Sequence, residues 1–325
     1  MKGTSLSNLT MKKRNYSRRF IEGAYYHIYQ RTVNRGLLFY SETDFLVCVS
    51  ILTTMAERYH IIIISVCFML DHIHLLIFSE SKDDLSNFMR DFTSIYAKQF
   101  NNSIGRRGAV FEKRFGSAPK RNDKEVRSCI SYVYNNPVEK KLCINAEEWK
   151  WNFLQFSDET IGLLLGKKHY SPAFNKGSDL LRSFRGHGWH LNYAMLRNIF
   201  SSIDEEEKES MINYIIRLYL PINFNFLLDF YDNKSSMFIS IHGTTGKEFD
   251  IKETFEPFSH RSFIRMINLV SNMKTFSDIK EVIMLSDNEK LDLSWKLSIE
   301  AKATTRQISK FLHIDEDLIT GRRLI

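Results

Sequence analysis

Hydrophobic and polar positions in the first part of the chain follow short strand-like patterns separated by longer helix-like ones. Residues 24–33 are rich in aromatic and β-branched types and predict a strand. Residues 61–70 form a nearly continuous apolar run, which is typical of a strand buried on both faces. Asp71 interrupts this run, and residues 72–79 predict the next strand.

Helical patterns lie between and after these strands. They predict helices over residues 41–58, 83–100 and 123–136. Ser41 has the character of an N-cap, because an acidic residue follows it three positions later. The third helix is expected to end before Pro137, since the residue that precedes a proline disfavours helical backbone.

A basic, extended stretch over residues 110–122 supplies a fourth predicted strand. The order β-α-β-β-α-β-α predicts an antiparallel sheet with helices on one side, a ferredoxin-like α+β fold. Beyond this part the pattern becomes helical, so the fold is expected to continue into an all-α C-terminal extension. We expect three parts, over residues 1–157, 158–258 and 259–325, the second being a helical connecting region.

The end of the third part has the pattern of a helix-turn-helix. Gln307, Ile308, Phe311 and Leu312 share one face of a predicted helix, and Ile314 lies in the turn that follows. Helical hairpins with this spacing are common. The sequence therefore leaves open whether these terminal helices contact DNA.

Positive charge is concentrated in the first half of the chain. Residues 1–150 contain 23 Lys and Arg against 15 Asp and Glu, a net charge of +8, whereas residues 151–325 contain 22 against 23, a net charge of −1. An excess of this kind indicates binding to a polyanion, with nucleic acid as the leading candidate.

The composition argues against a secreted or membrane protein. The four cysteines lack CxxC spacing and lie among apolar neighbours, which favours buried thiols in a reducing compartment. No run approaches the roughly 18 apolar residues of a membrane span. Residues 1–19 are basic but lack the apolar segment of a signal peptide. We expect a cytoplasmic protein without membrane contact.

His72 and His74 are candidate metal ligands, because residues two apart on a strand point to the same face. Neutral imidazole is a common metal ligand. The alternative is two polar edge residues with satisfied hydrogen bonds, although the apolar run after them indicates a central strand. Asp71 either orients one of the histidines or simply ends the preceding strand.

Tyr132 and Asn136 lie four residues apart on the third predicted helix and therefore share a face. The amide oxygen of Asn136 would complete a metal site made of two imidazoles and one oxygen. A phenol is a weak nucleophile at neutral pH, and a nearby divalent cation would compensate for this. Tyr134 points to another side of the helix, but the sequence does not settle which tyrosine faces the metal.

Basic residues in the same half are candidate DNA contacts. Phe111 and Phe115 interleave with some of them, as on surfaces that stack unpaired bases, although core aromatics on a charged face would give the same pattern. The candidate DNA-binding residues are Arg31, Arg35, Arg106, Arg107, Lys113, Arg114, Lys120 and Arg121.

Taken together, these motifs resemble the HUH single-tyrosine transposases, in particular the REP-associated tyrosine transposases. The matching segments are residues 31–36 (RTVNRG), 72–74 (HIH), 111–115 (FEKRF), 132–138 (YVYNNPV) and 149–151 (WKW). The resemblance covers residues 20–157 and says nothing firm about residues 158–325.

The resemblance implies the HUH nuclease fold and metal-dependent cleavage of single-stranded DNA. His72, His74 and Asn136 would bind Mg²⁺ or Mn²⁺. Tyr132 would attack a phosphodiester, leaving a 5′-phosphotyrosine and a free 3′-hydroxyl for strand transfer. The expected substrates are palindromes that fold into hairpins, and either a monomer or a homodimer is compatible with the sequence.

Two other functions compete with this one. A non-catalytic DNA-binding regulator derived from a transposase would keep the fold and the terminal helices, but it has little use for the complete set of His72, His74, Tyr132 and Asn136. A phosphodiesterase with a metal-activated water normally needs more carboxylates than Asp71 alone.

Overall fold

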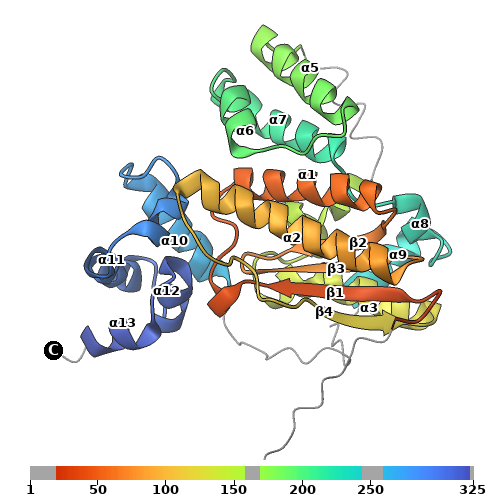
Figure 1. Cartoon of the computed structure of the whole chain (residues 1–325), viewed down its shortest axis with the longest axis horizontal. Coiled ribbons are helices and arrows are strands. Elements are labelled where there is room, and N and C mark those ends of the chain that lie inside the picture. Colours follow the sequence, from red (N-terminus) through yellow and green to blue (C-terminus); the bar gives the residue numbers. More distant parts are fainter. Residues whose placement is uncertain (1–19, 158–168, 244–258, 323–325) are drawn as a thin grey trace, which may run out of the picture.

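The computed structural model describes residues 20–157, 169–243 and 259–322 (Figure 1). Its central feature is an antiparallel four-stranded sheet with the order β2-β3-β1-β4. The strands are β1 (Tyr25–Arg31), β2 (Ile62–Phe68), β3 (His72–Phe78) and β4 (Gly116–Lys120). The α+β fold with a helical C-terminal part, expected from the sequence, is confirmed.

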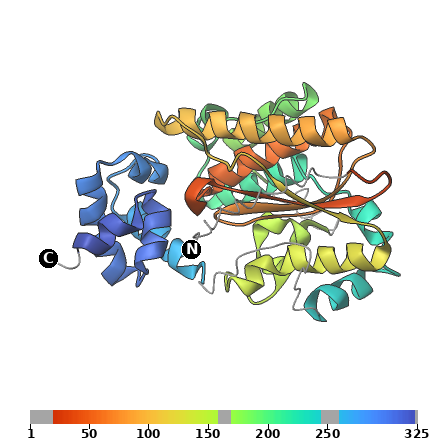
Figure 2. The same ribbon diagram turned by 60° about the horizontal axis from the view of Figure 1, so that its bottom comes forward.

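Helices cover both faces of the sheet. α1 (Glu42–Arg58) and α2 (Lys82–Ile104) lie on one face, and α3 (Asp123–Glu139) lies on the other, as Figure 2 shows. The expectation of helices on one side only is therefore wrong. The reason is that the central strands are apolar on both faces, so both faces must be shielded from water.

The side chains of β3 divide between these two layers. Ile73, Leu75 and Ile77 are buried in the cluster under α1 and α2. Leu76 is buried in the cluster under α3, and the ring of His74 lies against that helix. The period-two alternation of a strand thus separates a purely apolar layer from the layer that carries the histidines.

Helix boundaries follow local capping chemistry. Ser41 caps α1 in a capping box with Asp44, as expected. Asn122 caps α3, and that helix continues through Pro137 to Glu139, so its predicted end before the proline is wrong. Pro137 lies in the last turn of α3 and cannot donate to the carbonyl four residues earlier, but its own carbonyl still accepts from the Leu142 N–H.

The fourth strand is shorter than predicted. Only Gly116–Lys120 pairs with β1, whereas Phe111 forms an isolated bridge to Thr32. Residues 112–115 between these two points lack strand pairing. The basic character of residues 110–122 therefore belongs mainly to a connecting segment.

The remaining helices surround this α/β core. α5, α6 and α7 gather beyond α1, α8 adjoins β2, and α9 packs on α3 (Figure 1). Their bounds are α5 (Pro172–Gly186), α6 (Tyr193–Phe200), α7 (Glu205–Leu218), α8 (Phe224–Leu228) and α9 (Lys234–Gly243). Short 3₁₀ helices are η1 (Val33–Arg35), η2 (Ala146–Glu148), η3 (Lys150–Asn152) and η4 (Leu154–Ser157).

The C-terminal helices form a compact group at one end of the sheet (Figure 2). They are α10 (Arg261–Asn272), η5 (Ile279–Met284), α11 (Asp287–Glu300), α12 (Thr305–Leu312) and α13 (Glu316–Arg322). The expected helix, turn and terminal helix are present as α12, a turn at the left-handed His313, and α13. Contact of these helices with DNA remains a prediction.

The expected division into three parts also remains a prediction. Its boundaries at residues 158 and 258 fall in the segments 158–168 and 244–258, which lie outside the described residues, as does the basic stretch 1–19. All four cysteines are free thiols, and three of them are buried. Within the described part of the chain, no helix combines the length and the apolar character of a membrane span.

Candidate active site

The two halves of the predicted site meet between β3 and α3. The ring of Tyr132, on α3, lies 5.5 Å from the ring of His74, and the His72 and His74 rings lie 4.8 Å apart, measured between centroids. His74 is fully buried and Tyr132 is only 6% exposed. The candidate nucleophile and the histidine pair are therefore in contact, although about sixty residues separate them along the chain.

A third histidine, His27 on β1, completes this arrangement and was missed in the sequence. Its ring lies 5.4 Å from that of Tyr132, and its Nε2 is 3.1 Å from Nδ1 of His74. His27 pairs with Leu76 in the strand register, so it lies on the same face as His74. The alternation of residues 24–33 assigns His27 to one face of its strand, but only the β1–β3 register shows that this face is the one that carries His74.

The contact with His27 couples the tautomer of His74 to that of His27. Burial, the neighbouring His74 and Lys120 together lower the pKa of His27 well below its usual value, so this imidazole is neutral near pH 7. A neutral His27 that accepts at Nε2 requires the proton of His74 to lie on Nδ1. Nε2 of His74 is then the nitrogen suited to bind a metal.

Asp71 performs the corresponding task for His72. Its Oδ1 is 2.6 Å from Nδ1 of His72, which directs Nε2 of His72 away from the carboxylate. Burial alone would raise the pKa of the Asp71 carboxyl, but His72 and His260 hold this pKa well below its usual range. Of the two interpretations left open by the sequence, the geometry favours the one in which Asp71 orients a histidine.

Asn136 lies one turn after Tyr132 on the same face of α3. Its Nδ2 donates to the Tyr132 carbonyl over 2.9 Å, and the side chain is 2% exposed. With the amide nitrogen oriented in this way, Oδ1 is the atom that can serve as a ligand. The helix therefore carries a phenol and an amide on one face, and the phenol ring contacts the histidines.

These donors fit a divalent cation with mixed nitrogen and oxygen ligands. Two imidazoles and one amide oxygen would supply three ligands, and the remaining coordination positions of the cation could take water or phosphate oxygens. Among residues 20–157, 169–243 and 259–322, no group of three or more His, Cys, Asp or Glu side chains is placed to hold a metal. A metal bound here would thus depend on Asn136 in addition to the histidines.

Tyr134 lies apart from the histidines. It is fully buried, and its environment includes Tyr231 and Cys67. Burial raises the pKa of Tyr134 well above its ordinary value. Of the two tyrosines in the motif, Tyr132 is the one whose ring touches the histidine layer.

Arg31 is the basic candidate that the strand register places opposite the histidine pair. It is the register partner of His72, and directly opposed residues of an antiparallel pair point to the same face. Its guanidinium lies 5.0 Å from the centre of the Tyr29 ring. That ring rests on Gly116, where an added Cβ would lie 1.9 Å from it. The absence of a side chain at Gly116 thus leaves room for the Tyr29 ring, which the Arg31 guanidinium contacts.

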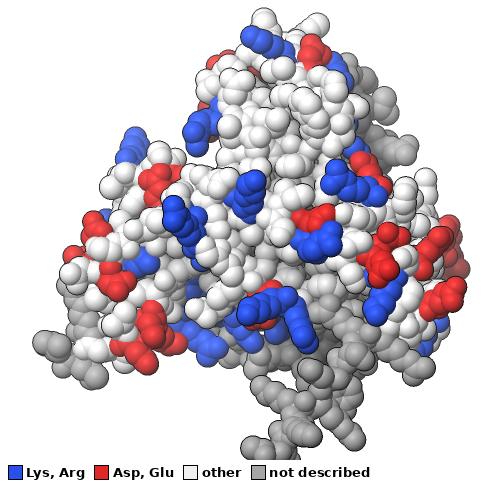
Figure 3. Space-filling model, viewed as in Figure 1, with Lys and Arg blue, Asp and Glu red and all other residues white. Residues whose placement is uncertain are grey.

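The other basic candidates differ in their accessibility. Arg107, Lys113, Arg114 and Arg121 are exposed, and Arg35 is half-buried. Figure 3 shows Lys and Arg mixed with acidic side chains over the face it displays, without one continuous basic surface.

Three residues of the predicted DNA surface are used by the fold. The Lys120 side chain is 1% exposed, and Arg106 donates to the loop carbonyl of Ala109 and to the side chain of Asn101. Phe111 is 8% exposed and packs against Tyr96. The idea that Phe111 lies on a base-stacking surface is wrong, because its ring belongs to the core.

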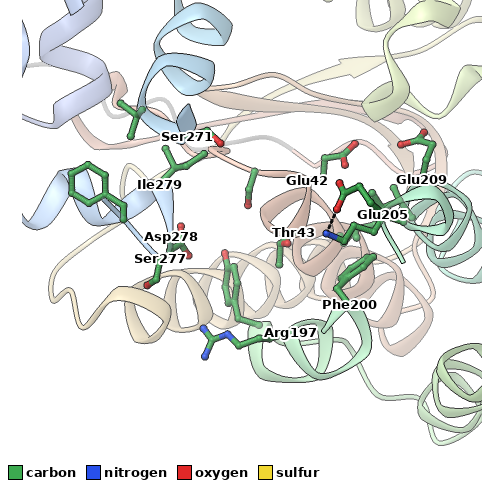
Figure 4. A pocket seen from close by; sticks show the side chains of 17 residues that line it. Glu42, Thr43, Arg197, Phe200, Glu205, Glu209, Ser271, Ser277, Asp278 and Ile279 are labelled. Carbon is green, nitrogen blue, oxygen red and sulfur yellow. Dashed lines mark hydrogen bonds and ion pairs between the residues drawn. The ribbon is translucent and has the colours of Figure 1, made fainter. Parts of the chain in front are cut away.

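A cleft of about 710 Å³ lies away from the histidines, between α1, α6, α7 and the segment before η5 (Figure 4). Arg197 and Phe200 of α6 and Glu42 of α1 are among its lining residues. None of the predicted site residues lines it. The candidate chemistry therefore lies at the contact between sheet and helix, outside this cleft.

An antiparallel sheet with a histidine pair facing a helical tyrosine is the arrangement expected for a tyrosine transposase domain. Residues 20–136 match the family model described as "Transposase IS200 like". The match covers only this part of the chain, and it supports the resemblance inferred from the motifs.

Two individual proteins are also similar. A protein of Haemophilus influenzae, described as a REP-associated tyrosine transposase, is 27% identical over 106 residues, which cover 30% of this chain and 60% of that relative. A solved structure, described as a REP-associated tyrosine transposase bound to a REP hairpin, is 22% identical with a TM-score of 0.38, covering 44% of this chain and 83% of that one. The family match ends at residue 136, so the later helices have no counterpart in it.

Proposed function

We propose that this protein cleaves single-stranded DNA and transfers the cut strand through a covalent bond to Tyr132. The observation that carries the proposal is the contact of the Tyr132 ring with His74 and His27, on the sheet face that also holds His72. The match of residues 20–136 to the IS200-like transposase model supports a role in transposition. The expected substrate is a strand that folds into a hairpin, as the resemblance of the motifs to the REP-associated tyrosine transposases implies.

In the proposed reaction, the Tyr132 hydroxyl oxygen attacks a phosphodiester phosphorus. The bond from phosphorus to the 3′ oxygen of the preceding nucleotide breaks, and that oxygen takes up a proton while the phenol loses one. The product is a 5′-phosphotyrosine with a free 3′-hydroxyl. Because one phosphoester replaces another, a second 3′-hydroxyl can reverse the step without an external energy source.

The residues around Tyr132 orient the reacting groups. His72, His74 and Asn136 would hold Mg²⁺ or Mn²⁺, which when bound polarises the phosphate and offsets charge in the transition state. Asp71 and His27 set the orientation of the two imidazoles. Arg31 lies beside His72 in the register and is the proposed contact for a neighbouring phosphate.

The burial of Tyr132 also gives some support to a second function. With 6% exposure of Tyr132 and none of His74, DNA reaches the phenol only if α3 or its surroundings move. A regulator that binds DNA without cutting it would keep this site closed. A phosphodiesterase is less well supported, since the carboxylate next to the pair, Asp71, is engaged by His72.

The test uses hairpin-forming oligonucleotides labelled at either the 5′ or the 3′ end, incubated with the full chain and Mn²⁺. We expect a protein adduct that resists denaturation and carries only the 3′ label, because the fragment with the new 5′ phosphate stays on the tyrosine. EDTA should abolish the adduct. Binding without any adduct would favour the regulator, and release of both fragments without an adduct would favour a water-dependent phosphodiesterase.

A further inference from the structure

The C-terminal helices contact the α/β part of the chain, residues 20–157, at the candidate site itself. α10 begins beside the end of the sheet (Figure 2), and its preceding residue, His260, is 5% exposed. This position lies outside the family match, which ends at residue 136. Its contacts reach both structural elements that carry the site.

The first contact is with the histidine half of the site. Nε2 of His260 lies 3.9 Å from Oδ1 of Asp71, the same oxygen that engages His72. Burial lowers the pKa of His260 to about 4, so near pH 7 a neutral ring packs against the carboxylate. The Asp71 backbone is also held, since its carbonyl accepts from the Thr32 hydroxyl over 3.2 Å.

The second contact is with the end of α3. The His260 N–H donates to the Lys140 carbonyl over 3.0 Å, and Nε of Arg261 donates to the Lys141 carbonyl over 2.6 Å. Lys140 caps α3, and its own N–H donates to the Asn136 carbonyl. Lys140 therefore links the start of α10 to the backbone of Asn136, the proposed metal ligand, through two hydrogen bonds.

The start of α10 is itself anchored within the C-terminal helices. The Ser259 carbonyl accepts from Nε2 of Gln307 on α12, and the His260 ring packs edge-on against Phe263. α12 in turn contacts the α/β part, because its Lys310 carbonyl accepts from the Leu37 N–H. A displacement of the C-terminal helices would thus be transmitted to His260 and Arg261.

We propose that His260 and Arg261 are positioning residues that hold the β3 and α3 halves of the site in register. The inference rests on the proposed function for its chemical meaning. His260 acts through Asp71 on His72, and Arg261 acts through the end of α3 on Asn136 and Tyr132. The C-terminal helices are then part of the catalytic machinery, in addition to any contact that they make with DNA.

The variants are His260→Phe and Arg261→Met, with Arg265→Met as the matched control. Arg265 is also exposed on α10 and also donates through Nε to a carbonyl, but that carbonyl belongs to Ala301 of the C-terminal helices. Two properties are measured on the full chain: amide hydrogen exchange, and Mn²⁺ affinity from the electron paramagnetic resonance signal of free Mn²⁺.

We expect both variants to speed exchange in residues 69–76 and 130–142 together. Their Mn²⁺ affinity should fall by about 3- to 10-fold, less than the ~10–100-fold typical of losing a direct partner of a metal ligand. Arg265→Met should match the wild type in both measurements. Faster exchange confined to residues 259–322, or wild-type exchange in both variants, would overturn the proposal.

The design separates this inference from the proposed function. If the wild type forms no covalent adduct with DNA, the proposed function fails, while hydrogen exchange still decides whether α10 holds the two halves together. If the adduct forms but both variants exchange and bind Mn²⁺ as the wild type does, only the positioning role fails.

Discussion

Three imidazoles and one phenol meet between β1, β3 and α3. The hydrogen-bond partners of the imidazoles determine which ring nitrogen each of them presents. His27 and Asp71 each engage one Nδ1 atom, on His74 and His72 respectively. When each Nδ1 carries the proton, Nε2 of both histidines is the nitrogen suited to bind a metal. The site is thus organised by partners of the histidines as much as by the histidines themselves.

Replacing His27 by phenylalanine tests this role directly. Phenylalanine keeps an aromatic ring, so the buried space stays filled, but the ring nitrogen that contacts His74 is lost. We expect Mn²⁺ affinity and the rate of adduct formation to fall by about 10- to 100-fold. His242→Phe is the control, because His242 is an exposed histidine that pairs with Glu147. Unchanged Mn²⁺ affinity in a folded His27→Phe protein would contradict the role.

At the scale of elements, much of the fold follows from local patterns. Short windows of sequence encode strands β1, β2 and β3, the capped start of α1 at Ser41, and the placement of Tyr132 and Asn136 on one helix. The site residues named from the sequence were His72, His74, Tyr132 and Asn136, and the structure brings His72, His74 and Tyr132 together.

What the sequence did not reveal depends on long-range pairing. His27 joins the site only through the β1–β3 register, and His260 only through the docking of helices beyond residue 258. Burial of Phe111 and Lys120 is likewise a tertiary effect, since both lie in a stretch whose composition is basic and polar. No local periodicity carries this information.

The turn between α12 and α13 is a docking element. His313 donates from Nε2 to the Leu37 carbonyl over 3.1 Å, and its ring fills the space above Gly36, where a Cβ would lie 2.4 Å away. The exposed start of α13 carries Asp315 and Glu316, which would repel DNA phosphates. The geometry therefore favours attachment to the α/β core over groove reading by this end of α13.

This docking should weaken in mild acid. Burial, partly offset by the hydrogen bond to Leu37, lowers the pKa of His313 to about 4, below the unfolded value of about 6.5. Between these two values the unfolded chain binds the proton and the folded chain does not, so stability falls as the pH decreases. From pH 7 to 5 the loss is at most about 2 kcal/mol.

The measurement is the free energy of unfolding against pH for the wild type and for His313→Gln. Glutamine keeps a donor for the Leu37 carbonyl but does not titrate in this range. We expect a shallower decrease between pH 7 and 5 in His313→Gln. Parallel curves for the two proteins would show that His313 does not contribute.

For the whole molecule, a buried ion pair connects its separate parts. Nζ of Lys280, on η5, contacts Oδ1 of Asp44 on α1, and both side chains are fully buried. The hydroxyl of Tyr193, on α6, donates to the same carboxylate oxygen. One carboxylate thus joins the sheet-covering helix, the middle helices and the C-terminal helices.

Removing the cation should therefore destabilise the assembly of all three parts. Lys280→Met leaves the Asp44 carboxylate buried without its cation, which costs about 3–5 kcal/mol. Lys296→Met removes a lysine from the exposed pair with Glu300, and it should cost at most ~0.5 kcal/mol. Chemical denaturation followed by tryptophan fluorescence compares the two. Equal effects would show that the buried pair has no special part in stability.

The central claim is that Tyr132 forms the covalent bond with DNA, and the motif itself provides the matched pair of variants. Tyr132→Phe and Tyr134→Phe each remove one hydroxyl two residues apart on α3. The direct measurement is covalent adduct formation with a 3′-labelled hairpin oligonucleotide in Mn²⁺, with hairpin affinity measured in parallel. We predict that Tyr132→Phe forms no adduct while binding the hairpin nearly as well as the wild type, and that Tyr134→Phe still forms it. An adduct that survives in Tyr132→Phe and disappears in Tyr134→Phe would contradict the account.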